Sequence, residues 1–222
     1  MIKAVIFDLW DTLIPATINF EHVKRLAKHD HLTKTEFVIR YEKAVQLKRY
    51  NSFEEMQNDF FTEFNQHGNK ELAQVMNDIY TKRMESIHYF PDVLPALALL
   101  RKGGLKLGLL SNTESFGFGR LESRLKFSNH LDVLAPSFVT KALKPDKKGF
   151  LWILKKLKVK PEEAIMIGDS LRADILGAQN AGLHNCLINR SGAKIDKSIA
   201  VPEFAIKSFD ELEKVVGELN GK

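Results

Sequence analysis

The sequence predicts an α/β protein whose parallel sheet is interrupted, early in the chain, by an all-helical insertion. Short apolar runs alternate with helical patterns from residue 91 onward, and one further apolar run occupies residues 4–7. Alternation of this kind indicates a parallel sheet with helices on both faces. The roughly seventy residues between these parts show helical periodicity only and are too many for a bare loop. We therefore expect a core formed by residues 1–14 and 91–222, and a separate helical domain formed by residues 15–90.

The first strand leads directly into Asp8, and Pro15 ends the strand pattern. In the insertion, apolar residues recur at helical spacing. Capping boxes at Thr33–Glu36 and Ser52–Glu55 predict two helix starts, and Asn69 can cap another helix. Short connections between these helices indicate a small bundle. Its helices are expected to begin near residues 19, 33, 52 and 69.

The second part of the chain repeats a strand followed by a helix. Gly and Pro residues separate the segments, as they do in turns. Strands are expected at residues 105–110, 164–168, 184–189 and 204–206, and one or two short strands are expected within residues 131–140. Helices are expected at residues 91–101, 146–157 and 173–181, and a last helix is expected from Ser208.

Composition places the chain among ordinary globular proteins, with 222 residues, 44% of them hydrophobic and 27% charged. The one cysteine, Cys186, excludes an intramolecular disulfide and a Cys-rich zinc site, and its apolar neighbours indicate a buried thiol. No run approaches the ~20 apolar residues of a membrane span. The N-terminus does not resemble a secretion signal. We expect a cytoplasmic protein that binds no membrane.

The formal charge of +5 permits an anionic partner without naming one. Lysines are dense in residues 141–160, but aromatic residues do not interleave there as they do in nucleic-acid sites. A solvated helix face is the better interpretation, so the expected partner is a small anionic molecule and not a nucleic acid. Monomer and dimer both remain open.

Polar residues stand where three of the predicted strands end. They are Asp8 to Thr12, the pair Ser111-Asn112, and Asp169 to Asp174, and Lys144 adds a charge in a loop. Each alone has an ordinary explanation as a turn or helix-cap residue. In an open parallel sheet, however, ligands bind at the carboxyl ends of the strands, so these residues are expected to converge.

The order of these residues resembles the four motifs of the haloacid dehalogenase-like (HAD) hydrolases. Motif I resembles Asp8-Leu9-Trp10-Asp11-Thr12, motif II Leu110-Ser111-Asn112, motif III Lys144-Pro145-Asp146, and motif IV the stretch from Ile167 to Asp174. The insertion has the position and helical character of the family's C1 cap. The resemblance implies a Rossmann-like core and a cap domain over residues 15–90.

The resemblance also implies a chemistry in which a carboxylate attacks a substrate beside Mg²⁺. It assigns Asp8 as nucleophile and metal ligand, the backbone carbonyl of Trp10 and the Asp169 carboxylate as further ligands, and Asp174 as a partner that acts directly behind them or through a water. Thr12 would support motif I. Three groups would bind the transferring phosphoryl oxygens: Ser111, the Asn112 backbone N–H and Lys144.

Trp10 departs from the family pattern, because phosphatases of the family carry an Asp there that protonates the leaving group. An indole N–H donates a hydrogen bond but does not give up its proton. The first interpretation is a small-molecule phosphatase in which Asp11 replaces the acid or the substrate needs little protonation. A turn residue or helix cap is the favoured interpretation of Asp11.

Two other interpretations remain. A 2-haloacid dehalogenase would tolerate an aromatic residue at Trp10, since halide leaves without a proton, but its metal-free site would not keep Asp169. The third interpretation is a binding or regulatory protein that has lost catalysis. The cap offers candidate substrate contacts that the sequence does not rank: His22, Arg25, Arg40, Tyr41 and Arg49.

Overall fold

The computed structural model describes residues 1–16 and 18–221, apart from the side chain of Arg83. Its centre is a six-stranded sheet in the order β3-β2-β1-β4-β5-β6, with every neighbouring pair parallel. The strands are β1 (Ala4–Phe7), β2 (Lys106–Ser111), β3 (Val133–Pro136), β4 (Ala164–Gly168), β5 (His184–Ile188) and β6 (Phe204–Ile206). The predicted parallel α/β fold is confirmed.

Alternate residues of each strand point to opposite faces, and each face is covered by helices. Val5 and Phe7 pack in one apolar cluster with α6 (Val93–Lys102) and α12 (Leu212–Leu219). Ala4 and Ile6 pack in another with α10 (Lys147–Leu157) and α11 (Leu176–Ala181). Burial of both faces is what makes these strands continuously apolar.

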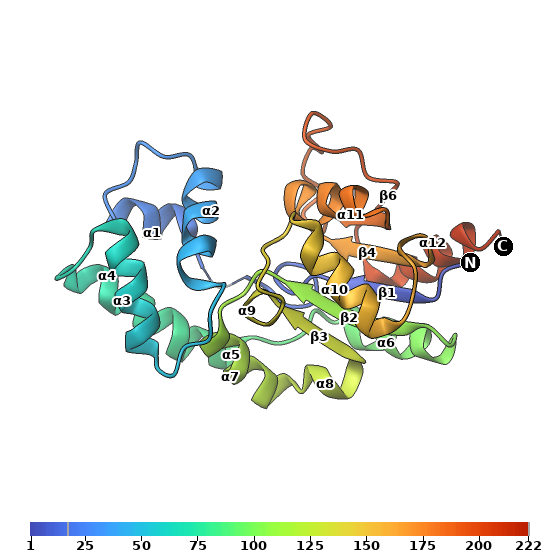
Figure 1. Cartoon of the computed structure of the whole chain (residues 1–222), viewed down its shortest axis with the longest axis horizontal. Helices are drawn as coiled ribbons and strands as arrows, with labels where there is room; N and C mark the ends of the chain where they lie inside the picture. Colours follow the sequence, from blue (N-terminus) through green and yellow to red (C-terminus); the bar gives the residue numbers. More distant parts are fainter. Residues whose placement is uncertain (17, 222) are drawn as a thin grey trace.

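The inserted segment consists of four main helices that lie to one side of the sheet (Figure 1). They are α1 (Phe20–Leu26), α2 (Lys34–Val45), α3 (Phe53–Phe64) and α4 (Lys70–Asp78), followed by a π-helical turn (Ile79–Arg83) and α5 (Met84–Ser86). Thr33 and Ser52 cap α2 and α3 as the sequence predicts. We call residues 18–86 the helical segment; its status as a separate domain stays a prediction.

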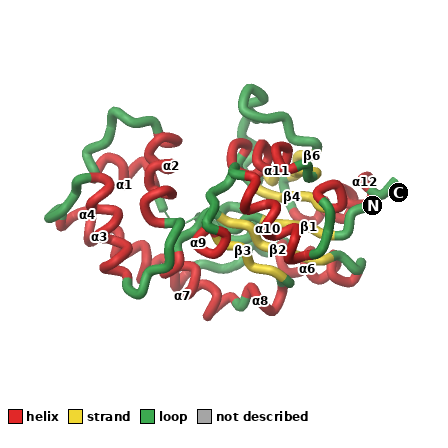
Figure 2. The backbone as a smooth tube through the Cα atoms, in the orientation of Figure 1, coloured by secondary structure: helices red, strands yellow, loops and turns green. Residues whose placement is uncertain are grey.

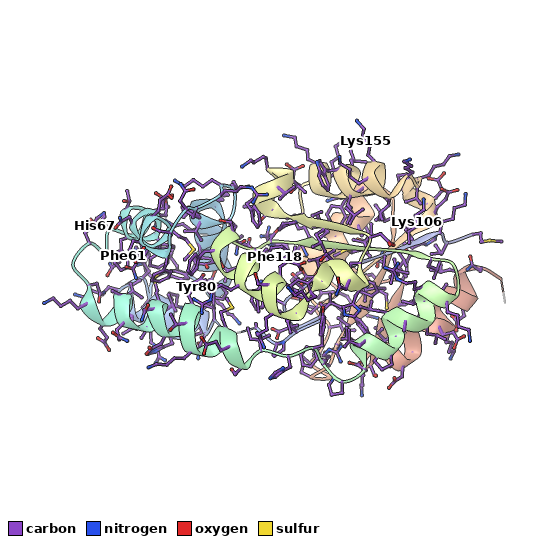
Figure 3. The ribbon with its side chains drawn as sticks, turned by 90° about the horizontal axis from the view of Figure 1, so that it is seen from below. Phe61, His67, Tyr80, Lys106, Phe118 and Lys155 are labelled. Atoms are coloured by element: carbon purple, nitrogen blue, oxygen red, sulfur yellow. The ribbon has the colours of Figure 1, made fainter. Side chains whose placement is uncertain are left out.

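An aromatic cluster holds the helical segment together. Phe64 lies 4.6 Å from Phe37 and 4.7 Å from Phe60 between ring centroids, which joins α3 to α2. Figure 3 shows Phe61 and His67 at the end of the segment far from the sheet, and Tyr80 at the end nearer Phe118 of α7 (Ser115–Leu125).

The segment contacts the core through the chain that follows α2. The hydroxyl of Ser137 donates to the carbonyl of Gln46 at 2.7 Å, and the backbone N–H of Tyr50 donates to the hydroxyl of Ser115 at 2.8 Å. The guanidinium of Arg49 stacks on the ring of Phe138 at 4.9 Å. These contacts hold the C-terminal end of α2 over the strand ends.

Several boundaries differ from the sequence predictions. The region 131–140 contains one strand, β3, followed directly by the short helix α9 (Ser137–Thr140). The helix expected at 173–181 begins instead as a π-helical turn, Leu171–Ile175, before α11. The sequence analysis assigned nothing to residues 113–130, where the structure has α7 and α8 (Phe127–His130) (Figure 2).

Two further expectations concern the whole chain. Cys186 is buried in β5, as its apolar neighbours predict. Within the described part of the chain, no helix is long and apolar enough to cross a bilayer.

Candidate active site

A cavity of about 260 Å³ lies between the strand ends and the helical segment. The core contributes Asp8, Asn112, Lys144, Asp169 and Asp174, and the helical segment contributes one face of α2 and the turn after α4. The motif residues therefore converge at one edge of the sheet, as the rule for parallel sheets predicts.

Lys144 joins two carboxylates at the floor of this cavity. Its Nζ lies 2.5 Å from Oδ1 of Asp8 and 2.5 Å from Oδ1 of Asp174, and all three side chains are buried. Burial opposes a positive charge here, but the charges of Asp174 and Asp8 outweigh it and raise the pKa of Lys144 above its ordinary value. Lys144 is therefore held as an ammonium between the two carboxylates.

Asp174 reaches this place because the end of β4 is a glycine. A Cβ on Gly168 would lie 2.3 Å from Cγ and Oδ2 of Asp174, so any side chain there would displace the carboxylate. Oδ2 of Asp174 also accepts the backbone N–H of Ser170 at 3.0 Å. Gly168 and Ser170 together fix the direction in which Asp174 points.

Asp8, Asp169 and Asp174 form an acidic cluster in which one oxygen from each lies within 4.8 Å of the others. Asp169 stands at the open mouth of the cavity and keeps exposed surface. Loss of bulk water, followed by the nearby charges of Asp8 and Asp174, raises its pKa to about 8. Burial also raises the pKa of Asp174 to about 6, and Lys144 partly offsets this.

The cluster is therefore short of positive charge, since one ammonium faces three carboxylates. An all-oxygen donor set at this spacing suits a hard divalent cation. The residues present thus fit a bound metal, with Asp8, Asp169 and Asp174 as the side chains that would hold it.

Motif II and motif III are bound to each other through Asn112. Its Oδ1 accepts the backbone N–H of Lys144 at 2.8 Å, and its Nδ2 donates to the Lys144 carbonyl at 3.2 Å. The buried hydroxyl of Ser111 has no hydrogen-bond partner among the residues the structure describes. An unpaired buried hydroxyl next to Asn112 agrees with, but does not test, the predicted phosphoryl-binding role of Ser111.

The loop after β1 is a tight turn closed by Asp11. Asp11 has a positive φ of 53°, and its Oδ1 accepts the backbone N–H of Ala16 at 2.9 Å. Trp10 is half-buried and lines the cavity beside it. Thr12 is buried beneath, and its hydroxyl has no partner within residues 1–16 and 18–221. The turn geometry favours the structural interpretation of Asp11.

Of the cavity residues that the helical segment supplies, sequence reasoning named Tyr41 and missed the others. Lys34, Val38, Tyr41 and Glu42 line the cavity from one face of α2. Their spacing of about four residues was a readable signal. Oε1 of Glu42 accepts Nδ2 of Asn112 at 3.0 Å, which links the segment to motif II.

Glu114 and a pair of tyrosines form the deeper wall of the cavity. The hydroxyls of Tyr41 and Tyr80 lie 2.6 Å apart. Glu114 is buried and accepts the backbone N–H of Gly117 on both oxygens at 2.9 Å. Burial raises the pKa of Glu114 to about 7, although N–H donors from Gly117 and Phe116 oppose the shift.

Of the cap candidates named from sequence, Tyr41 lines the cavity. Arg40 instead pairs with Glu63 and stacks over Phe64 at 5.0 Å, and Arg49 stacks on Phe138. The guanidinium groups of both arginines are therefore engaged by other residues of the protein.

The family model of the haloacid dehalogenase-like hydrolases matches residues 2–182. The chain belongs to this family. A curated relative, the glyceraldehyde 3-phosphate phosphatase of Methanopyrus kandleri, is 29% identical over 99% of this chain and 99% of its own. Among solved structures, a HAD phosphatase from Thermococcus onnurineus is 28% identical with a TM-score of 0.66, covering 97% of this hydrolase and 98% of its own chain.

A 2-haloacid dehalogenase from Pseudomonas syringae has the same fold, with a TM-score of 0.67 over 98% of this hydrolase and 99% of its own chain. Its sequence identity is 23%, so it bears on the fold alone.

Proposed function

We propose that this hydrolase is a Mg²⁺-dependent phosphatase of small phosphorylated molecules that works through a phosphoryl group held covalently on Asp8. The observation that carries the proposal is the acidic cluster of Asp8, Asp169 and Asp174 around Lys144. Two curated relatives named as phosphatases support it: the Methanopyrus enzyme and the glyceraldehyde 3-phosphate phosphatase of Pyrococcus furiosus, 27% identical over 99% of this chain.

In this proposal Asp8 attacks phosphorus and forms an aspartyl phosphate while the alcohol leaves. Lys144 holds the carboxylate of Asp8 in place and offers positive charge to the phosphoryl oxygens. Asn112 fixes the backbone of Lys144, and Ser111 and the backbone N–H of Asn112 donate to the same oxygens. Mg²⁺ held by Asp8, Asp169 and the Trp10 carbonyl, with Asp174 behind, would neutralise the remaining negative charge.

We further propose that the helical segment is a C1-type cap that closes over this site. A closed lid excludes water and brings side chains to the substrate. The contacts of Ser137 with Gln46 and of Arg49 with Phe138 support a closed arrangement. A cytoplasmic location stays a prediction.

The charges of the cavity oppose the dehalogenase alternative. A 2-haloacid carries a carboxylate, and Asp169 adds a further carboxyl group beside Asp8, where that anion would have to approach. Like charges in a partly buried site are unfavourable. A phosphate ester places its charge at the floor instead, where Lys144 lies.

The test is to incubate the protein with acetyl phosphate, p-nitrophenyl phosphate and L-2-chloropropionate, with Mg²⁺ or with EDTA, and to measure phosphate and chloride. We expect phosphate release that requires Mg²⁺, and no chloride. Undiminished phosphate release in EDTA would contradict the metal assignment, and metal-independent chloride release would favour the dehalogenase.

A further inference from the structure

The proposed phosphatase lacks a proton donor at the place where motif I supplies one. Trp10 lines the cavity in that position, and its indole cannot exchange a proton with the substrate. An alkoxide is a poor leaving group, so hydrolysis of an ordinary phosphate ester needs an acid near the ester oxygen. If the proposed function holds, another side chain must supply the proton to the ester oxygen.

Most carboxyl groups that line the cavity already have another role and are not free to protonate a leaving group. Asp11 closes its own turn through the backbone N–H of Ala16. Glu114 directs both oxygens to the backbone N–H of Gly117 and so caps α7. Asp169 and Asp174 belong to the acidic cluster beside Asp8.

Glu42 is the remaining carboxyl group among the cavity residues that the structure describes. It lines the cavity from α2, on the helical segment, and its side chain reaches the residue that follows β2. Its side chain is 14% exposed. Oε1 accepts Nδ2 of Asn112, while Oε2 lies 3.9 Å from Nη2 of Arg172, beyond hydrogen-bond distance. One oxygen is therefore anchored and the other is available.

The charges around Glu42 come from both parts of the protein. Burial raises its pKa most strongly; the hydrogen bond from Asn112 and the charges of Arg172 and Lys144 oppose the shift, and Asp8 adds to it. The net direction is upward, which favours the protonated carboxyl group that an acid catalyst needs.

We propose that Glu42 is the general acid and base of this hydrolase, supplied by the helical segment in place of Trp10. In the first step, the Oδ of Asp8 bonds to phosphorus, the bond from phosphorus to the ester oxygen breaks, and Glu42 gives its proton to that oxygen. In the second step, water attacks phosphorus, the bond to Asp8 breaks, and the Glu42 carboxylate takes a proton from the water. Inorganic phosphate leaves, and Asp8 and protonated Glu42 are restored.

This arrangement makes catalysis depend on closure. Glu42 reaches motif II only when α2 lies over the strand ends, where the contact between Ser137 and Gln46 holds it. The acid would then be absent from the open enzyme, which limits attack by water before a substrate is enclosed.

A purely structural role for Glu42 as a link between the segment and Asn112 makes a different prediction. A lost link would slow every substrate alike, whereas a lost acid slows only substrates whose leaving group needs a proton. Leaving-group dependence therefore separates the two roles.

The experiment compares kcat/KM of the wild type and Glu42→Gln for glycerol 3-phosphate, whose alcohol leaves poorly, and acetyl phosphate, whose acetate leaves readily. Gln can still accept the hydrogen bond from Asn112 but cannot give up a proton. We expect a loss of ~10²–10⁴-fold for glycerol 3-phosphate and less than about threefold for acetyl phosphate. Glu71→Gln, on the exposed first turn of α4, is the matched control and should change neither value.

Equal losses for the two substrates, or no loss for glycerol 3-phosphate, would overturn the role of Glu42 while leaving the phosphatase proposal intact. Failure of the wild type to hydrolyse acetyl phosphate with Mg²⁺ would overturn the proposed function and the role of Glu42 together.

Discussion

Gly168 is the residue on which the position of Asp174 depends. The strand end passes so close to the carboxylate that a Cβ would lie 2.3 Å from its Cγ and Oδ2. Contacts this short force a shift of one group or the other. Because Asp174 holds Lys144 and Lys144 holds Asp8, a shift at Asp174 would be passed to Asp8, the proposed nucleophile.

We predict that Gly168→Ala lowers kcat by ~10²-fold or more, because misplacement of a catalytic group by about 1 Å costs that much. Overpacking should also destabilise the fold by about 1–3 kcal/mol. Steady-state kinetics and denaturant unfolding measure the two effects. Gly119→Ala is the control: no atom lies within 4 Å of its added Cβ, and in a helix it should stabilise by about 0.5–1 kcal/mol. Normal activity of Gly168→Ala would show that Asp174 does not position the site.

Asp8, Asn112 and Asp169 could be predicted from sequence because each follows the end of a strand, and Lys144 because it belongs to the loop that resembles motif III. Asp8, Asn112, Lys144 and Asp169 all line the cavity, as predicted. Glu42 and Glu114 were not found. Their places depend on how the helical segment folds over the sheet.

At the scale of elements, α7 depends on its N-cap. Its sequence contains Gly117 and Gly119, both poor helix formers, which explains why the sequence analysis missed it. Glu114 satisfies the backbone N–H of Gly117, and Phe118 and Leu121 bury the inner face of the helix. Tertiary packing and the cap outweigh weak propensity here.

Glu114 should also make stability depend on pH. Burial raises its pKa in the folded state from 4.5 to about 7. Between these values the folded chain keeps a proton that the unfolded chain releases, so the free energy of unfolding falls as pH rises through this range. The loss should reach at most about 3 kcal/mol for a shift of this size.

Glu114→Gln keeps an acceptor for the Gly117 N–H but cannot ionise. We predict that its stability declines less than that of the wild type between about pH 5 and about pH 8, measured by denaturant unfolding. Glu213→Gln, at an exposed site on α12, should follow the wild type. Parallel curves for wild type and Glu114→Gln would show that Glu114 ionises freely in the folded protein.

For the molecule as a whole, the alternation of strands and helices was enough to predict the parallel sheet and the insertion. Periodicity reports burial along one element, so it captured β1, β4 and the capped helices α2 and α3. It does not report how the helical segment packs against the sheet. The cavity between the sheet and the helical segment, and the contacts of Gln46 and Arg49 with the core, therefore came only from the structure.

The sheet and the helical segment contribute different residues to the cavity. The sheet places Asp8, Asp169 and Asp174 near the ends of its strands, and Lys144 lies beside them. The helical segment brings Tyr41, Glu42 and Tyr80 to the opposite wall. If the helical segment is a lid, as proposed, this arrangement suits a reaction in which a phosphate is held in one place while leaving groups vary.

If the phosphoryl group passes through Asp8, acid quenching during turnover should trap it on that side chain. Protein mixed with Mg²⁺ and acetyl phosphate labelled in the phosphoryl group should retain label on the chain after denaturation. Hydroxylamine should release that label, and Asp8→Asn should show neither label nor turnover. Sustained phosphate release by Asp8→Asn, or rapid turnover by the wild type with no label on the chain, would contradict the account.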